Sequence, residues 1–181
     1  EPDRTSPKNY LDGIIGLLPT PISGEEKEKL RSDPALDYEL ILGNALTTLP
    51  SVLGYVFRTS SQGDHQQAES PFPSCAIHID PPAIPLTAIN FITASHAIVN
   101  IADIAQSASE GFFNVFPDPS GTMRKVPLFM ALNGVPYPSL ALETMRIGLK
   151  EKDVTIHVSR REGMARRGIL GITVNGQFIP T

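Results

Sequence analysis

The polar residues between positions 114 and 139 are those whose types and spacing could perform chemistry. Asp118 and Gly121 mark a turn, and Arg124 follows it closely enough for its guanidinium to pair with the Asp118 carboxylate. A few convergent polar groups of this kind suffice to bind a small molecule. Two interpretations stay open: a structural turn held by Asp118 and Arg124, or a ligand site lined by Asn114, Asp118, Arg124 and Ser139.

Histidines raise the question of a metal site. His78 and Asp80 are two residues apart on an expected strand and share one face, and Asp64 and His65 could join them. Structural zinc sites usually use Cys heavily, but Cys75 is the single cysteine and the sequence has no Cys-x-x-Cys or His-Glu-x-x-His motif. We therefore predict no metal site, and we interpret Cys75 as an inert thiol at the start of a buried strand.

Motifs for catalysis and for nucleic-acid binding are missing from the sequence. It has no Gly-x-Ser-x-Gly elbow and no Gly-rich phosphate loop, so we predict no catalytic residue and no cofactor. A net charge of -4 and a pI of 5.5 disfavour a nucleic-acid partner. The arginines at 160–167 could bind an anion or lipid headgroups, or could lie in a solvated loop.

The elements that must position these residues include three expected helices. Asp33 can cap a helix that begins at Pro34, Asn100 can cap a second, and Ser139 can cap a third. The apolar spacing predicts helices near 34–48, 100–110 and 139–150. Turn signals before Ser32 predict an irregular first segment. The uncharged run from 81 to 102 contains three prolines as well as polar asparagine, threonine and histidine residues, which makes it a poor membrane span.

The expected strands lie mostly toward the C-terminus. Residues 52–57 form a short apolar run that is typical of a buried strand, and 154–158 alternate in polarity, with His157 on the exposed side. Asn175-Gly176 predicts a tight hairpin turn after a strand at 169–174. The chain also predicts a hairpin of 112–116 with 123–132. We expect one α/β domain with a mixed central sheet flanked by helices and with antiparallel hairpins toward the C-terminus.

The order of these motifs resembles a known family. A Gly-Phe-x-Asn strand at 111–114, an Asp-x-x-Gly turn at 118–121 and an Arg-x-x-Pro-Leu strand at 124–128 precede a Tyr-x-Ser-Leu-Ala-Leu helix at 137–142. Together they resemble the type-two CHASE domain, a cyclase- and histidine-kinase-associated sensory extracellular domain. The resemblance covers most of residues 1–181 and is weakest at 60–95. It implies a C-terminal portion of the family domain, truncated at both ends.

The resemblance also implies a function. The chain would be the extracytoplasmic signal-input domain of a bacterial transmembrane protein, such as a sensor histidine kinase or nucleotide cyclase, with no catalysis of its own. It would lie on the periplasmic or extracellular face of the inner membrane, tethered by segments outside residues 1–181, and respond to an unknown small molecule or envelope signal. The alternatives are a periplasmic small-molecule-binding or hydrolytic protein and a homodimerisation module.

Overall fold

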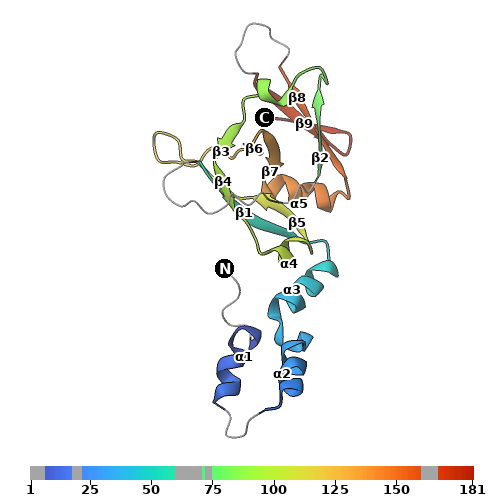
Figure 1. Cartoon of the computed structure of the whole chain (residues 1–181). Helices are drawn as coiled ribbons and strands as arrows, with labels where there is room; N and C mark the ends of the chain where they lie inside the picture. Colours follow the sequence, from blue (N-terminus) through green and yellow to red (C-terminus); the bar gives the residue numbers. More distant parts are fainter. Residues whose placement is uncertain (1–6, 18–21, 60–70, 72–74, 160–166) are drawn as a thin grey trace. The chain divides into compact units, whose positions relative to one another are not determined.

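The computed structural model describes residues 7–17, 22–59, 71, 75–159 and 167–181. It is a mixed α/β structure, as predicted, and the chain divides into two compact units (Figure 1). The first unit contains residues 1–51 and 101–108, and the second contains 52–100 and 109–181. Within the described ranges, no helix combines the length and the apolar character that crossing a membrane requires.

The first unit is helical where the sequence predicted an irregular segment. Ser23 caps the second helix: its hydroxyl accepts a hydrogen bond from the Glu26 amide (3.2 Å), and the Glu26 carboxylate accepts one from the Ser23 amide (3.0 Å). Arg31 forms an ion pair with Asp12 on the first helix (2.6 Å). The prediction of irregular structure was therefore wrong, because this capping box was not recognised. The helices of this unit are α1 (Pro7–Gly16), α2 (Gly24–Arg31), η1 (Pro34–Leu36), α3 (Tyr38–Thr47) and α4 (Ala102–Ala105).

Two of the predicted helices are divided or shortened. Asp33 caps a 3-10 turn that begins at Pro34, as expected, but Asp37 then starts a new helix, α3. In place of the helix expected over 100–110, only α4 forms. Asn100 does not cap it: its amide donates to the Gly54 carbonyl (3.2 Å) and to the carboxylate of buried Glu110 (2.8 Å). The long-range contacts of Asn100 thus override its local capping preference.

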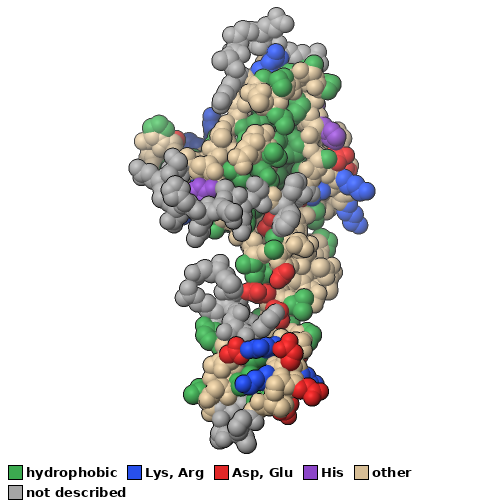
Figure 2. All heavy atoms as spheres, viewed as in Figure 1, with side chains coloured by type: hydrophobic (Ala, Val, Ile, Leu, Met, Phe, Trp, Pro, Cys, Tyr) green, Lys and Arg blue, Asp and Glu red, His purple; other side chains and the backbone are tan. Residues whose placement is uncertain are grey.

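The surface of the first unit is rich in charge. Figure 2 shows Asp, Glu, Lys and Arg side chains gathered over the region of α1 and α2. On α3, Leu40 and Ile41 are exposed, and Gly43 is the buried residue of that helix. The apolar residues Leu40 and Ile41 of this helix are therefore not buried by the part of the chain that the structure describes.

The described residues of the second unit form three mixed sheets. In the first sheet, β1 pairs antiparallel with β4 and parallel with β5. In the second sheet, β2 pairs parallel with β8, and β8, β9 and β10 follow one another in antiparallel order. In the third sheet, β3 pairs parallel with β6, which forms a hairpin with β7. Helix α5 (Leu140–Gly148) packs against β1 and β5 (Figure 1). The strands are β1 (Val52–Arg58), β2 (Ala76–Asp80), β3 (Ile92–Ala94), β4 (His96–Ile98), β5 (Ser109–Phe112), β6 (Phe129–Leu132), β7 (Val135–Pro138), β8 (Asp153–Val158), β9 (Ile169–Val174) and β10 (Gln177–Pro180).

Where the structure describes this unit, its core consists of two apolar clusters. One is aromatic: Phe57 on β1 lies 5.2 Å from Tyr55, 5.6 Å from Phe112 and 5.7 Å from Tyr137, measured between ring centroids. In the other cluster, the buried side chains of β8 and β9 pack with residues between 84 and 142. Its fully or nearly fully buried members include Ile89, Phe129, Leu142, Val154, Ile156, Val158, Ile172 and Val174.

The strands at both ends of this unit's sequence agree with the predictions, whereas the middle hairpin does not. The strand at 52–57 and the C-terminal strands form, and Asn175 and Gly176 take the positive φ values of their turn (51° and 69°). Instead of the hairpin of 112–116 with 123–132, β5 ends at Phe112 and β6 begins at Phe129. Prolines at 117, 119 and 127 lack the amide donors that a continuous ladder would need.

Candidate functional site

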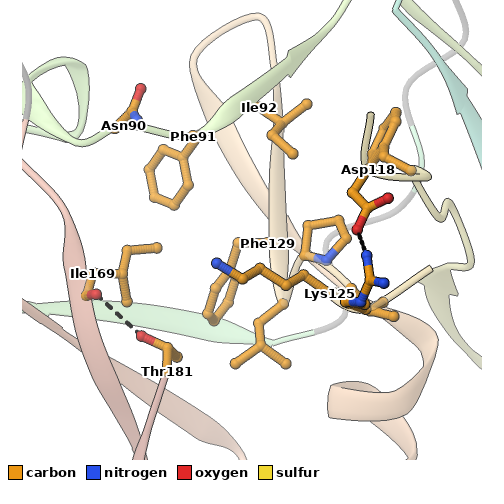
Figure 3. Close-up of a pocket in the computed structure, with 13 residues that line it drawn as sticks. Asn90, Phe91, Ile92, Asp118, Lys125, Phe129, Ile169 and Thr181 are labelled. Atoms are coloured by element: carbon orange, nitrogen blue, oxygen red, sulfur yellow. Dashed lines mark hydrogen bonds and ion pairs between the residues drawn. The ribbon is translucent and has the colours of Figure 1, made fainter. Parts of the chain in front are cut away.

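A cavity of about 670 Å³ opens beside the segment that leads from β5 to β6. Three parts of the chain line it: residues 90–92 leading into β3, residues between 116 and 129, and, near the C-terminus, residue 169 at the start of β9 and residue 181 after β10 (Figure 3). This volume lies within the range of roughly 300–1,000 Å³ that is typical of small-molecule sites. Its size and lining therefore make it the candidate binding site.

Apolar side chains form most of the cavity wall. Phe91 and Phe129 are both buried, and their rings meet edge to face with centroids 6.4 Å apart. Ile92 and Val126 are partly exposed at the cavity, which leaves them accessible to a ligand. The remaining apolar lining residues are Phe116, Pro127, Leu128 and Ile169.

A compact turn brings the predicted residues Asp118 and Arg124 to this cavity. The Asp118 carboxylate accepts hydrogen bonds from the amides of Ser120 (2.9 Å) and Thr122 (3.2 Å), while Gly121 takes a φ of +80°. The same carboxylate forms an ion pair with Arg124, and the predicted pairing of these two residues is confirmed. The turn is thus held by its own side chains, and it also forms part of the cavity lining.

Arg124 and Lys125 are adjacent in sequence but differ in their partners. Besides the Asp118 carboxylate, the Arg124 guanidinium donates to the Ser120 hydroxyl (3.0 Å). Lys125 forms no ion pair or hydrogen bond with any residue that the structure describes. Figure 3 shows its side chain reaching into the cavity, with the amine toward Phe91 and Phe129.

Asn114, another predicted site residue, is used by the backbone of β1. Its side-chain oxygen accepts from the Phe57 amide (2.8 Å), and its side-chain nitrogen donates to the Phe57 carbonyl (2.7 Å). The side chain therefore supplies the hydrogen bonds that a residue of β5 would give to β1 if β5 continued past Phe112. Asn114 is not among the residues that line the cavity.

Ser139 likewise has a structural role at the start of α5 and does not line the cavity. It is the N-cap of α5, as predicted, and its hydroxyl accepts a hydrogen bond from the Leu142 amide (3.3 Å). Its backbone amide donates to the Leu128 carbonyl (2.8 Å), which fixes the start of β6 beside the start of α5. The structure thus brings Asp118 and Arg124 together at the cavity and leaves Asn114 and Ser139 outside its lining.

A second polar group lies on the outer side of the four-stranded sheet. His157 Nδ1 is 2.8 Å from the Asp80 carboxylate and His157 Nε2 is 2.7 Å from the Thr173 hydroxyl. Because the Asp80 carboxylate can only accept, Nδ1 donates to it, and Nε2 pairs with the Thr173 hydroxyl. The Phe178 ring meets the imidazole edge to face, with centroids 5.3 Å apart. His157 lies on the outer face of its strand, as the alternation predicted, but its side chain is only 27% exposed, because alternation in one strand cannot reveal partners on neighbouring strands.

The residues considered for a metal site are engaged separately. His78 lies 3.7 Å from Asp153, while Asp80 pairs with His157. Asp64 and His65 lie outside the described residues. Across the described ranges, no group of three or more His, Cys, Asp or Glu side chains could hold a metal ion. Cys75 precedes β2 and packs against the core, where burial raises the pKa of its thiol to about 11.

The arginine cluster is described at one position. Arg160, Arg161 and Arg166 lie outside the described residues. Arg167 donates to the Ser159 carbonyl (3.3 Å), and its own backbone carbonyl accepts from the Asn90 amide (2.9 Å). Arg167 thus connects Ser159, which follows β8, with the cavity residue Asn90.

Comparison of the chain with family models, with curated proteins and with solved structures found no match. The arguments about the site therefore depend on its geometry. Sequence reasoning missed Phe91, Phe129 and Ile169, which come from distant segments. The signal closest to them was the apolar character of the short segments that contain them, and this character does not specify which strands pair.

Proposed function

We propose that this chain is the signal-input domain of a bacterial transmembrane signalling protein, and that it binds a small molecule in the cavity beside the Asp118 turn. The binding part of the proposal is carried by a single observation: a cavity of about 670 Å³ with an apolar wall and a few polar groups at the turn. The placement outside the cytoplasmic membrane, with an output domain elsewhere in the parent protein, rests on the resemblance to the type-two CHASE domain.

A link from binding to signalling requires two conformations that bind the ligand unequally. The cavity lining includes the segment between β5 and β6, whose turn is held mainly by contacts within itself. A ligand that contacts this turn and the Phe91–Phe129 wall would favour the conformation in which both are in place. This segment is therefore the element that we expect to respond to occupancy.

The binding proposal is tested by a thermal-shift screen with a panel of small metabolites. A ligand at 100 times its dissociation constant stabilises the folded state by about 2.7 kcal/mol. Substitution Ile92→Trp would fill part of the cavity and should abolish the shift. Ile98→Trp is the matched control, because Ile98 is also an exposed strand residue but does not line the cavity.

The outcomes separate the proposal from its alternatives. A hit that survives in Ile98→Trp and is lost in Ile92→Trp supports binding in the cavity. A chain that self-associates and binds nothing in the panel would favour a dimerisation module instead. The signalling part requires that the same ligand change the output of the full-length parent protein, and an output insensitive to it would refute that part.

A further inference from the structure

The ionic groups of the cavity indicate the chemical class of its occupant. Among the side chains of the lining there is one carboxylate, Asp118, and there are two cations, Arg124 and Lys125. Asp118 and Arg124 neutralise each other in their ion pair. Lys125 has no carboxylate partner in the parts of the chain that the structure describes. The side chains of the lining therefore offer one uncompensated positive charge.

The position of this charge relative to the apolar wall matters as much as its sign. The Lys125 amine reaches toward Phe91 and Phe129 (Figure 3), so a ligand packed on those rings would meet the amine at one end. A lysine ammonium has three donors and no acceptor, and its hydrogen bonds to carboxylates are about twice as strong as neutral ones. An apolar molecule without an acid group would offer the Lys125 amine no hydrogen-bond acceptor.

We propose that the cavity binds a small amphipathic carboxylate, with its apolar part on Phe91 and Phe129 and its carboxylate paired with Lys125. A single negative charge matches the single uncompensated cation, whereas a doubly charged phosphate would bring excess negative charge close to Asp118. This inference deepens the proposed function and rests on it, since it names the ligand class of the same site.

The test uses phenylbutyrate and phenylbutanol, which share an apolar part and differ in the acid group. Isothermal titration calorimetry on the 181-residue chain with an amidated C-terminus, so that Thr181 adds no carboxylate to the lining, should give an affinity about tenfold higher for the acid. Lys125→Met keeps much of the apolar stem and removes the charge, so it should lower the acid's affinity about tenfold and leave the alcohol's unchanged. Lys125→Arg should retain most of the acid's affinity.

Lys152→Met is the matched control, because Lys152 is an exposed lysine outside the cavity lining. Equal binding of acid and alcohol, or an acid affinity that Lys125→Met leaves unchanged, would overturn the carboxylate assignment while leaving small-molecule binding intact. The same holds if the metabolite panel yields only neutral ligands. Failure of both probes and of the whole panel would overturn the proposed function as well.

Discussion

At the scale of single residues, the Asp118 carboxylate both binds two backbone amides of its own turn and forms an ion pair with Arg124. The amide contacts are local, so they form whether or not the cavity is occupied. Arg124 is mostly exposed, and its side chain therefore contributes less to stability than the carboxylate does.

Substitutions in this turn should follow that order. Asp118→Ala should lower the free energy of unfolding by about 1–2 kcal/mol, because two amides and a guanidinium lose their acceptor. Arg124→Ala should lower it by about 1 kcal/mol or less. Lys125→Ala, in the same segment, serves as the control and should change it little. Urea denaturation measures all three, and equal effects of Asp118→Ala and Lys125→Ala would contradict the structural role of the turn.

His157 should contribute to stability through its two side-chain partners. Removing it by His157→Ala leaves Asp80 and Thr173 without their shared neighbour, and we expect a loss of about 1–2 kcal/mol. His78→Ala on the adjacent strand is the control, with an expected change below about 0.5 kcal/mol because the contact of His78 with Asp153 is long and exposed. Indistinguishable urea midpoints for the two variants would show that the His157 contacts contribute nothing.

Cys75 should make stability depend on alkaline pH. Burial raises the pKa of its folded-state thiol to about 11, above roughly 8.5 for a cysteine in an unfolded chain. The folded protein then holds its proton where the unfolded chain has lost it, so stability falls as the pH rises between these values. Cys75→Ala should remove this contribution. Chemical denaturation from about pH 8 to pH 10.5 tests this, and parallel curves for the two proteins would refute it.

At the scale of elements, a close approach between β5 and the start of α5 depends on Gly111. A Cβ atom built on Gly111 would lie 2.6 Å from Leu140 Cα and 2.7 Å from Leu140 N, both backbone atoms. The neighbouring contact is the parallel bridge between Phe112 and Ser139. No side-chain rotation can relieve such an overlap, so β5 and α5 would have to separate.

Gly111→Ala should therefore lower the free energy of unfolding by about 3 kcal/mol. Gly148→Ala is a matched control, since Gly148 ends α5 and a Cβ there meets nothing within 4 Å. Alanine favours the helix over glycine, so this control should be neutral or stabilising by up to about 1 kcal/mol. Thermal and urea unfolding would measure both, and a well-folded Gly111→Ala protein of normal stability would disprove the close approach.

Local patterns predicted the elements that depend on local signals. The alternation of β8, the Asn175-Gly176 turn and the Ser139 cap could all be read from neighbouring residues, and so could the Asp118–Arg124 pair. The roles of Asn100 and Asn114 could not be read in this way, because each binds a backbone group more than 40 residues away in sequence, at separations of 46 and 57. Pairing of β3 with β6, which brings Phe91 beside Phe129, also depends on long-range packing.

At the scale of the whole molecule, the two units differ in how much apolar surface they bury. The described part of the first unit buries few apolar side chains, chiefly Leu11, Ile15 and Ala105, whereas the second contains both apolar clusters. Short helices are marginal unless packing supports them. The first unit should therefore open locally at a lower free energy than the second.

Hydrogen exchange measured by mass spectrometry should show this difference. Amides of α3 should exchange faster than those of α5, a helix of similar length that buries Leu142, Glu143 and Arg146 and so serves as an internal reference. Equal protection of the two helices would indicate that the first unit is stabilised by contacts outside the residues described. Such a result would argue for a second copy of the chain or another partner covering α3.

Residues 113 to 128 form a span of chain that is attached at both ends. Near one end, Asn114 binds the backbone of Phe57 within the aromatic cluster; at the other, the Leu128 carbonyl accepts from the Ser139 amide at the start of α5. A displacement of the turn between these attachments would therefore act on β1 and on α5, which contact each other. An event at the cavity mouth would reach the interior of the protein through these two attachments.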